Sequence, residues 1–188
     1  MATIRAATPG DADAIAAIYA PNVTGASISF ELEAPDAPEM SRRIGKTLLT
    51  FPWLVWDEDG VRGYVYASSH RERAAYQWSV DVSAYIDPGC RRRGIGKTLY
   101  ERLLRILRVQ GYQSAYAGIT LPNAASVGLH EAVGFRPVGV YRQVGFKRGA
   151  WHDVGWWHRS LGEPMPDPQP PRRWPEVAGS EDVLAALR

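Results

Sequence analysis

The sequence holds a single cysteine, few histidines and no long apolar run. Cys90 has no second cysteine with which to form an intrachain disulfide. The four histidines are dispersed and show no spacing typical of a metal site, so we expect no bound metal. No run of about 18 apolar residues and no basic start followed by an apolar segment is present, which argues against a membrane span or a secretory signal. We therefore expect a cytoplasmic protein.

No strong excess of either charge is present. The 188 residues include 22 Lys and Arg against 20 Asp and Glu, which gives a net charge of +2. This balance is too mild to indicate a nucleic-acid surface, and we expect neither nucleic acid nor membrane as a partner. The length and the 45% share of hydrophobic residues are typical of one globular domain.

Apolar periodicity and turn residues predict strands that alternate with helices in the middle of the chain, which favours an α/β fold. We expect strands at about 4–7, 53–56, 61–68, 76–86, 112–119, 135–144 and 151–158. We expect helices from Thr8-Pro9 onward and at about 38–49, 94–110 and 122–133. The domain is predicted to span residues 1–161. Residues 162–188 are predicted to form a proline-rich, extended tail with a possible short helix at 181–187.

A basic turn with two glycines leads from the strand ending at Ile86 into the helix at 94–110. Its backbone N–H groups and arginines are suited to binding phosphate oxygens. A dinucleotide fingerprint would need glycine at Leu99, and a nucleotide P-loop would need glycine at Arg91. The remaining pattern is R-x-x-G-x-G from Arg91 to Gly96, unless the run is only a solvated basic surface.

This pattern resembles the coenzyme A pyrophosphate loop of the GNAT superfamily of N-acetyltransferases. Residues 4–161 further resemble its phosphinothricin N-acetyltransferase branch. The matching segments are 30–35 (FELEAP), 51–55 (FPWLV), 71–81 (RERAAYQWSVD), 91–100 (RRRGIGKTLY), 121–135 (LPNAASVGLHEAVGF) and 149–155 (GAWHDVG). The resemblance implies a GNAT fold, with a mixed, splayed central sheet flanked by helices on both faces, and a homodimer.

The resemblance also implies acetyl-CoA as the co-substrate. The pantetheine arm would bond to the backbone of the strand that precedes the basic turn. Asn123 would bond to the same arm or cap the next helix, two roles that are compatible. The strand positions are Ala84, Tyr85 and Ile86. The pyrophosphate would lie on Arg91, Arg92, Arg93, Gly94, Ile95, Gly96 and Lys97.

Acetyl transfer to an amine needs a group that removes a proton and a group that protonates or stabilises the departing thiolate. By resemblance, Asp81 is the general base, acting directly or through a water. The family usually has glutamate there, and the shorter aspartate places its carboxylate about 1.5 Å further back. His130 is the second candidate, as an acid toward the thiolate or as a second base. Asp81 as a structural partner of a neighbouring group, and His130 as a packed residue, are the alternatives.

Four residues match the family positions around an acidic amino-acid substrate: Phe30, Arg71, Arg73 and Tyr76. In an extended segment Arg71 and Arg73 would point the same way and bind two oxygens of an anion, although both also fit a solvated loop. We expect acetylation of the α-amino group of a glutamate-like amino acid such as phosphinothricin, or of an arsinic or phosphinic analogue, which would detoxify it. The alternatives are methionine sulfone or sulfoximine as substrate, and a coenzyme A-binding module without catalysis.

Overall fold

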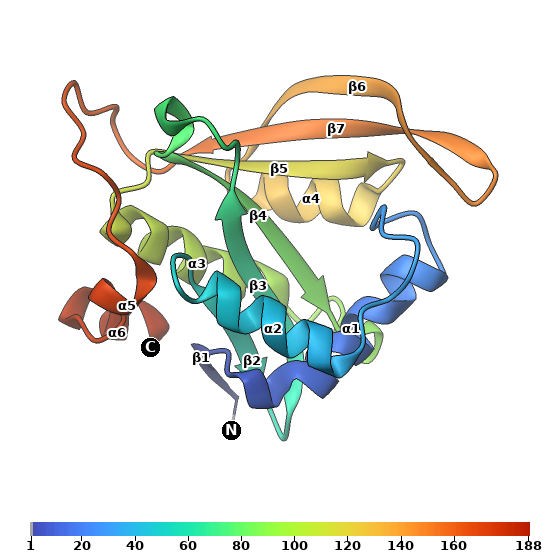
Figure 1. Cartoon of the computed structure of the whole chain (residues 1–188), viewed down its shortest axis with the longest axis horizontal. Coiled ribbons are helices and arrows are strands. Elements are labelled where there is room, and N and C mark those ends of the chain that lie inside the picture. Colours follow the sequence, from blue (N-terminus) through green and yellow to red (C-terminus); the bar gives the residue numbers. More distant parts are fainter. Residues whose placement is uncertain (1) are drawn as a thin grey trace.

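Seven strands form one mixed sheet in a computed structural model that describes residues 2–188 (Figure 1). The sheet order is β1-β2-β3-β4-β5-β7-β6, and β4–β5 is the parallel pair. The strands are β1 Thr3–Ala6, β2 Trp53–Asp57, β3 Val61–Ser69, β4 Ser79–Ile86, β5 Ser114–Leu121, β6 Arg136–Lys147 and β7 Ala150–Ser160. The helices are α1 Ala12–Thr24, α2 Ala37–Thr47, α3 Ile95–Gln110, α4 Ala124–Ala132, α5 Trp174–Val177 and α6 Glu181–Leu187. The predicted α/β order is confirmed.

Local capping signals set the ends of several helices where the sequence predicted them. The carboxylate of Asp36 accepts a hydrogen bond from the backbone N–H of Glu39 at 2.9 Å and starts α2. Gly94 and Gly111 both adopt left-handed backbone conformations, with φ of 82° and 103°, immediately before and after α3. Asn123 starts α4 as its N-cap. These positions confirm the predicted helices to within a few residues.

Alternating side chains of the central strands face two helical layers. Val80 and Val82 of β4 are buried in the core that includes α3, α5 and α6. The intervening positions, such as Tyr85, point to the opposite face, which α1 and α2 cover. The predicted helices on both faces of the sheet are confirmed.

The parallel pair β4–β5 is short. Its register runs from Ser79 opposite Ser114 to Asp81 opposite Tyr116 and then stops, whereas β4 continues to Ile86 and β5 to Leu121. Figure 1 shows the two strands starting side by side and then opening into a V. The predicted splayed sheet is confirmed, and the opening leaves one backbone edge of β4 without a strand partner.

The chain after β7 returns to the far end of α3. Trp174, Val177 and Val183 are buried in the same core as α3. The side-chain amide of Gln110, also buried, donates to the backbone oxygens of Thr50 at 3.0 Å and Arg172 at 2.8 Å. The tail therefore covers the end of α3 that lies away from the basic turn.

One predicted strand begins later than expected. Ala74–Tyr76 forms a 3-10 turn and β4 starts at Ser79, so the expected strand at 76–86 was wrong at its start. None of the described helices is both long and apolar enough to cross a membrane.

Candidate active site

A small pocket of about 60 Å³ lies in the opening between β4 and β5, here called the cleft pocket. Ala84 and Tyr85 line it from β4, and Asn123 and His130 line it from the start and end of α4. Beyond Asp81 the β4 edge has no partner from β5, so its backbone donors and acceptors are free for an extended ligand. The cleft pocket thus combines a strand edge with polar groups from α4.

The basic turn ends at the N-terminus of α3. Gly94 is the N-cap, and a Cβ at this position would meet no atom within 4 Å, so the turn is open to an approaching group. Arg91 and Arg92 are exposed, whereas the guanidinium of Arg93 binds the carboxylate of Glu58 at 2.8 Å. The N–H groups of the helix start and the exposed arginines are suited to an anion such as a pyrophosphate. Arg93 is already paired with an acid.

His130 is only 5% exposed, and both of its ring nitrogens have partners. Nδ1 lies 2.7 Å from the backbone oxygen of Ser126, which can only accept, so Nδ1 carries the hydrogen. Nε2 lies 2.9 Å from the hydroxyl of Tyr100, which donates to it when the ring is neutral. Burial lowers the pKa of His130 and raises that of Tyr100. The pair is therefore neutral at pH 7 and lines the cleft pocket as one unit.

Asn123 caps α4 with its side-chain oxygen, which accepts from the backbone N–H of Ser126 at 3.1 Å. The predicted capping role is confirmed. The same residue lines the cleft pocket, so its position is also compatible with contact to a ligand there.

Asp81 lies at the last rung of the β4–β5 ladder, where its carboxylate binds a histidine. Its Oδ1 lies 2.6 Å from Nδ1 of His70, a residue just past the end of β3. Burial raises the pKa of Asp81, and the bond to His70 opposes that shift. The His70 ring stacks on Tyr116 with centroids 4.4 Å apart.

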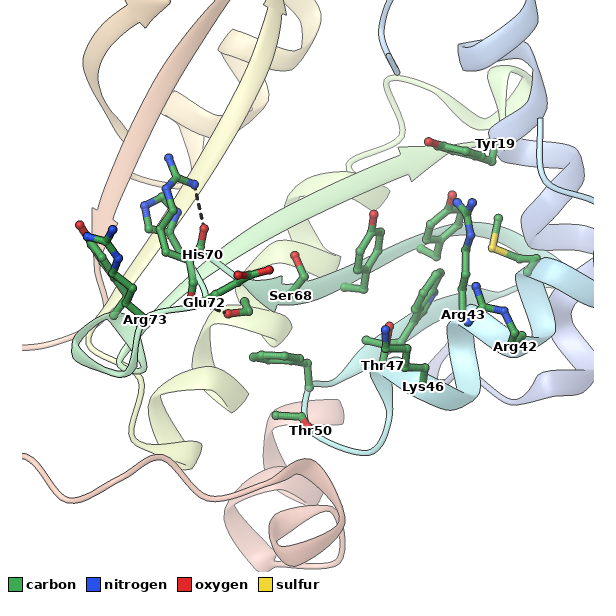
Figure 2. A pocket seen from close by; sticks show the side chains of 18 residues that line it. Tyr19, Arg42, Arg43, Lys46, Thr47, Thr50, Ser68, His70, Glu72 and Arg73 are labelled. Carbon is green, nitrogen blue, oxygen red and sulfur yellow. Dashed lines mark hydrogen bonds between the residues drawn. The ribbon is translucent and has the colours of Figure 1, made fainter. Parts of the chain in front are cut away.

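A larger cavity of about 970 Å³ lies next to this pair on the face that carries α1 and α2 (Figure 2). We call it the basic cavity, because five cationic side chains line it against one acidic side chain, Glu72. The cationic residues are Arg42, Arg43, Lys46, Arg71 and Arg73. Arg42 and Arg43 already bind Glu39, at 2.7 and 2.8 Å. Tyr64, Tyr66 and Trp53 supply an aromatic lining.

Arg71 and Arg73 both line the basic cavity, but they do not lie on one face of an extended segment. The backbone bends at this point and enters the 3-10 turn Ala74–Tyr76, so the extended segment on which the expected parallel orientation rested is absent. Arg71 donates to the backbone oxygen of His70 at 2.8 Å and lies over the ring of Trp156. Figure 2 shows Arg73 on the opposite side of the loop from Glu72. Tyr76 is 45% exposed beside them.

Phe30 lies in the loop between α1 and α2, is not among the residues that line either pocket, and packs on the backbone of Gly145 in β6. Lys147, 6% exposed, holds the same loop. Its amine donates to the backbone oxygens of Val23 at 2.6 Å, Ser29 at 2.7 Å and Glu31 at 2.7 Å. Burial lowers the pKa of Lys147. Lys147 of β6 therefore holds in place the end of α1 and the residues immediately before and after Phe30.

Comparison with known proteins identifies the family. A family model described as an acetyltransferase (GNAT) domain matches residues 4–156. The chain belongs to the GNAT acetyltransferase family. The phosphinothricin N-acetyltransferase of Streptomyces viridochromogenes is 38% identical over 170 residues, which cover 90% of this chain and 92% of that protein. The L-methionine sulfoximine/L-methionine sulfone acetyltransferase of Salmonella typhimurium is 32% identical, with 86% and 95% covered.

The fold comparison agrees with this GNAT assignment. The crystal structure of a GNAT superfamily phosphinothricin acetyltransferase from Sinorhizobium meliloti in complex with acetyl-CoA superposes with a TM-score of 0.84. It is 34% identical, and the superposition covers 94% of this chain and 97% of that chain.

Sequence reasoning missed two residues that the GNAT fold brings into the site. His70 follows the last residue of the β3–β4 ladder, in which Ser68 lies opposite Asp81. A hairpin register drawn from the sequence would have placed His70 near that carboxylate. Lys147 had no such signal, because its partners are backbone oxygens more than 100 positions away in the chain.

Proposed function

We propose that this chain is an N-acetyltransferase that moves an acetyl group from acetyl-CoA to the α-amino group of a small, anionic, glutamate-like amino acid. The observation that carries the proposal is the position of Asp81. It ends the β4–β5 ladder, with the cleft beyond it on one side and the basic cavity beside its His70 partner on the other. A donor lying in the cleft and an acceptor lying in the cavity would meet at this carboxylate. The names of the relatives reported above support the same reaction.

The polar groups around the cleft are of the kinds that acetyl-CoA would need. The free β4 edge at Ala84, Tyr85 and Ile86 offers backbone groups to the amides of the pantetheine arm. The helix start from Gly94 to Lys97, with Arg91 and Arg92, offers N–H groups and positive charge to the pyrophosphate. Bound there, acetyl-CoA supplies the thioester carbon that the amine attacks. The side chain of Ile95 is buried, so this residue would meet the ligand through its backbone N–H.

The reaction needs two proton transfers, and residues at opposite ends of the site are assigned to them. The substrate enters as an ammonium and must lose one proton before its nitrogen attacks, and Asp81 supplies the negative charge for this step. After attack, the new C–N bond leaves a second surplus proton on nitrogen, and the C–S bond breaks to give a thiolate. His130 and Tyr100, joined by a hydrogen bond beside the cleft, provide the proton for that thiolate, and the second surplus proton from nitrogen replaces it. One proton is released overall.

The basic cavity favours an anionic acceptor. Arg71, Arg73 and Tyr76 line it, whereas Phe30 lies in the α1–α2 loop outside this lining. Guanidinium groups bind carboxylate and phosphinate oxygens strongly, which suits an amino acid with a second anionic group. Acetylation removes the charge of the amine and with it the likeness to glutamate, so we propose a role in detoxification or resistance. The single reduced cysteine suits the cytoplasm.

The direct test is thiol release from acetyl-CoA with phosphinothricin and a panel of anionic and neutral amino acids. We expect the highest kcat/KM with an acceptor that carries two anionic groups. Absence of thiol release with every anionic amino acid would reject the proposed substrate class.

The nearest second candidate is methionine sulfone or sulfoximine, favoured by the relative from Salmonella typhimurium. Replacing Arg71 or Arg73 with alanine separates the two. We expect each change to raise KM for phosphinothricin by about 10- to 100-fold, the cost of one charged hydrogen bond, and to leave KM for methionine sulfone nearly unchanged. Steady-state kinetics with both substrates measures this. Equal effects on both substrates would favour the sulfone or sulfoximine enzyme.

Phe30 gives a second, steric test. A side chain at Gly145 would overlap the Phe30 ring, so Gly145→Ala must displace that ring. We expect KM for the amino acid to rise about 10-fold, in line with the cost of overpacking, and the Kd of acetyl-CoA to stay within about two-fold. Gly179→Ala is the control, because a Cβ there meets no atom within 4 Å. An unchanged KM in Gly145→Ala would remove Phe30 from the substrate site.

We also propose that the enzyme is a homodimer joined through β6. This strand forms an edge of the sheet and is exposed along most of its length. The exposed apolar side chains of β6 and the start of β7 are Val138, Val140, Tyr141, Val144, Phe146 and Trp151. An edge strand with such a patch is typical of a protein interface.

Phe146→Glu tests the dimer by placing a charge in that patch, where Phe146 packs on Trp151. We expect sedimentation to show a dimer for the wild type and the 20.8 kDa monomer for the variant. A wild-type monomer at micromolar concentration would contradict the proposal.

A further inference from the structure

The carboxylate of Asp81 is not free to meet the substrate with both oxygens, because Oδ1 is bound to His70 at 2.6 Å. We infer that the proton of the substrate ammonium is received at Nε2 of His70, with Asp81 as the partner that holds the opposite ring nitrogen. This inference rests on the proposed function and names the accepting atom. Asp81 then orients the ring and stabilises its charged form.

The hydrogen-bond geometry fixes the reactive nitrogen. An ionised carboxylate only accepts, so Nδ1 of His70 carries the hydrogen and Nε2 keeps its lone pair. Among the residues that the structure describes, Nε2 of His70 has no hydrogen-bond partner. This nitrogen is not fully buried, so a ligand can reach it. His70 also lines the basic cavity, where the acceptor amino acid is proposed to bind. The free lone pair therefore belongs to a ring that borders the substrate.

Aromatic neighbours hold the ring in place. Tyr116 stacks on it with an interplanar angle of 17°, and the rings of Tyr76 and Trp156 meet it edge-on at 6.2 and 5.9 Å. This packing leaves the imidazole little freedom to turn away from Asp81. The charged or titratable groups around the ring are Asp81 from β4, Tyr116 from β5, His158 from β7, which stacks on Tyr116, and Arg71 and Tyr76 from its own segment.

The pairing also accounts for the short side chain at position 81. The resemblance places a glutamate at this position. The side chain of aspartate is shorter by one methylene, so its carboxylate does not reach the point that a glutamate carboxylate would reach. The His70 ring adds reach beyond the Asp81 carboxylate and ends in a basic nitrogen. Burial alone would favour a protonated Asp81, whereas the bond to His70 favours its charged form.

The proposed step balances as follows. Nε2 of His70 forms a bond to one ammonium proton, and the N–H bond of the substrate breaks, leaving a neutral amine and an imidazolium beside the Asp81 carboxylate. The amine lone pair then forms the C–N bond with the thioester carbon, and the C–S bond breaks. The nitrogen loses its second surplus proton, which balances the proton that the departing thiolate takes up. The imidazolium releases its proton to solvent through the basic cavity, which resets the pair.

His70→Asn tests the assignment, because the asparagine amide can still donate to Asp81 but cannot accept a proton. We expect kcat/KM to fall by at least about 100-fold, with acetyl-CoA affinity and melting temperature close to those of the wild type. His158→Asn, a histidine bound to Ser114 at 3.1 Å in the same aromatic row, is the matched control with near-wild-type kinetics.

Retention of activity by His70→Asn within about three-fold, with Asp81→Asn inactive, would overturn the inference and make Asp81 the direct base. A second measurement does not depend on acetylation or on the variant folding. Long-range ¹H–¹⁵N spectra of the wild type report the His70 tautomer. A hydrogen on Nδ1 and a bare Nε2 support the inference, and a hydrogen on Nε2 overturns it. If no amino acid is acetylated, the proposed function has failed. The measured tautomer of His70 then decides by itself whether the His70–Asp81 pair exists.

Discussion

Asp81→Asn is expected to lower turnover by about 10²- to 10⁴-fold while leaving the Kd of acetyl-CoA within about two-fold. The change keeps the size of the side chain and an oxygen that accepts from His70, but it removes the negative charge that stabilises a proton near the substrate amine. Steady-state kinetics and calorimetric titration measure the two quantities separately. Unchanged turnover would remove Asp81 from the chemistry.

Asp81→Glu is the informative companion. The carboxylate already lies 2.6 Å from Nδ1 of His70, so an added methylene drives it into the imidazole instead of toward free space. We therefore expect glutamate to lower kcat as well, although less than asparagine does. Higher activity in Asp81→Glu than in the wild type would mean that the carboxylate itself reaches the substrate.

Lys147→Met is expected to destabilise the fold by roughly 3–5 kcal/mol, because it leaves three carbonyl oxygens without their donor, in two buried hydrogen bonds and one partly buried one. One of these oxygens belongs to Val23 in the last turn of α1, where a positive charge is also favoured by the helix dipole. Denaturant unfolding measures the loss. KM for the amino acid should rise as well, because Ser29 and Glu31 flank Phe30.

Arg148→Met is the control for this experiment. Arg148 follows Lys147 and donates to the neighbouring backbone oxygen of Thr24 at 2.8 Å, but its side chain is exposed. We expect a loss of less than about 1 kcal/mol. Similar losses in both variants would show that general charge near α1, not the buried amine, stabilises the loop.

The sequence predicted the turn and the helix starts around the cleft pocket well because their signals are local. The glycines of the basic turn, the cap at Asn123 and the apolar stripe of α3 lie within short segments, where spacing determines structure. The alternation of strands with helices likewise followed from periodicity. The splay of β4 from β5 came from the family resemblance, and the short β4–β5 register confirms it.

The acceptor side was harder to predict because its contacts join distant segments. His70 meets Asp81 across a hairpin, and Lys147 meets Ser29 across 118 positions. The paired direction of Arg71 and Arg73 rested on an extended backbone, whereas the 3-10 turn after Arg73 bends the segment. Side-chain direction in such loops is set by tertiary packing, here the ring of Trp156 under Arg71.

The sheet has two halves, β1-β2-β3-β4 and β5-β7-β6. They are joined only by the short parallel ladder between β4 and β5. The last rung pairs Asp81 with Tyr116, and His70 binds the first and stacks on the second. The imidazole of His70 thus links the two halves of the sheet at the point where β4 and β5 separate. The angle between the two halves, and so the width of the opening between β4 and β5, depends on the same side chains that we propose for the proton transfer.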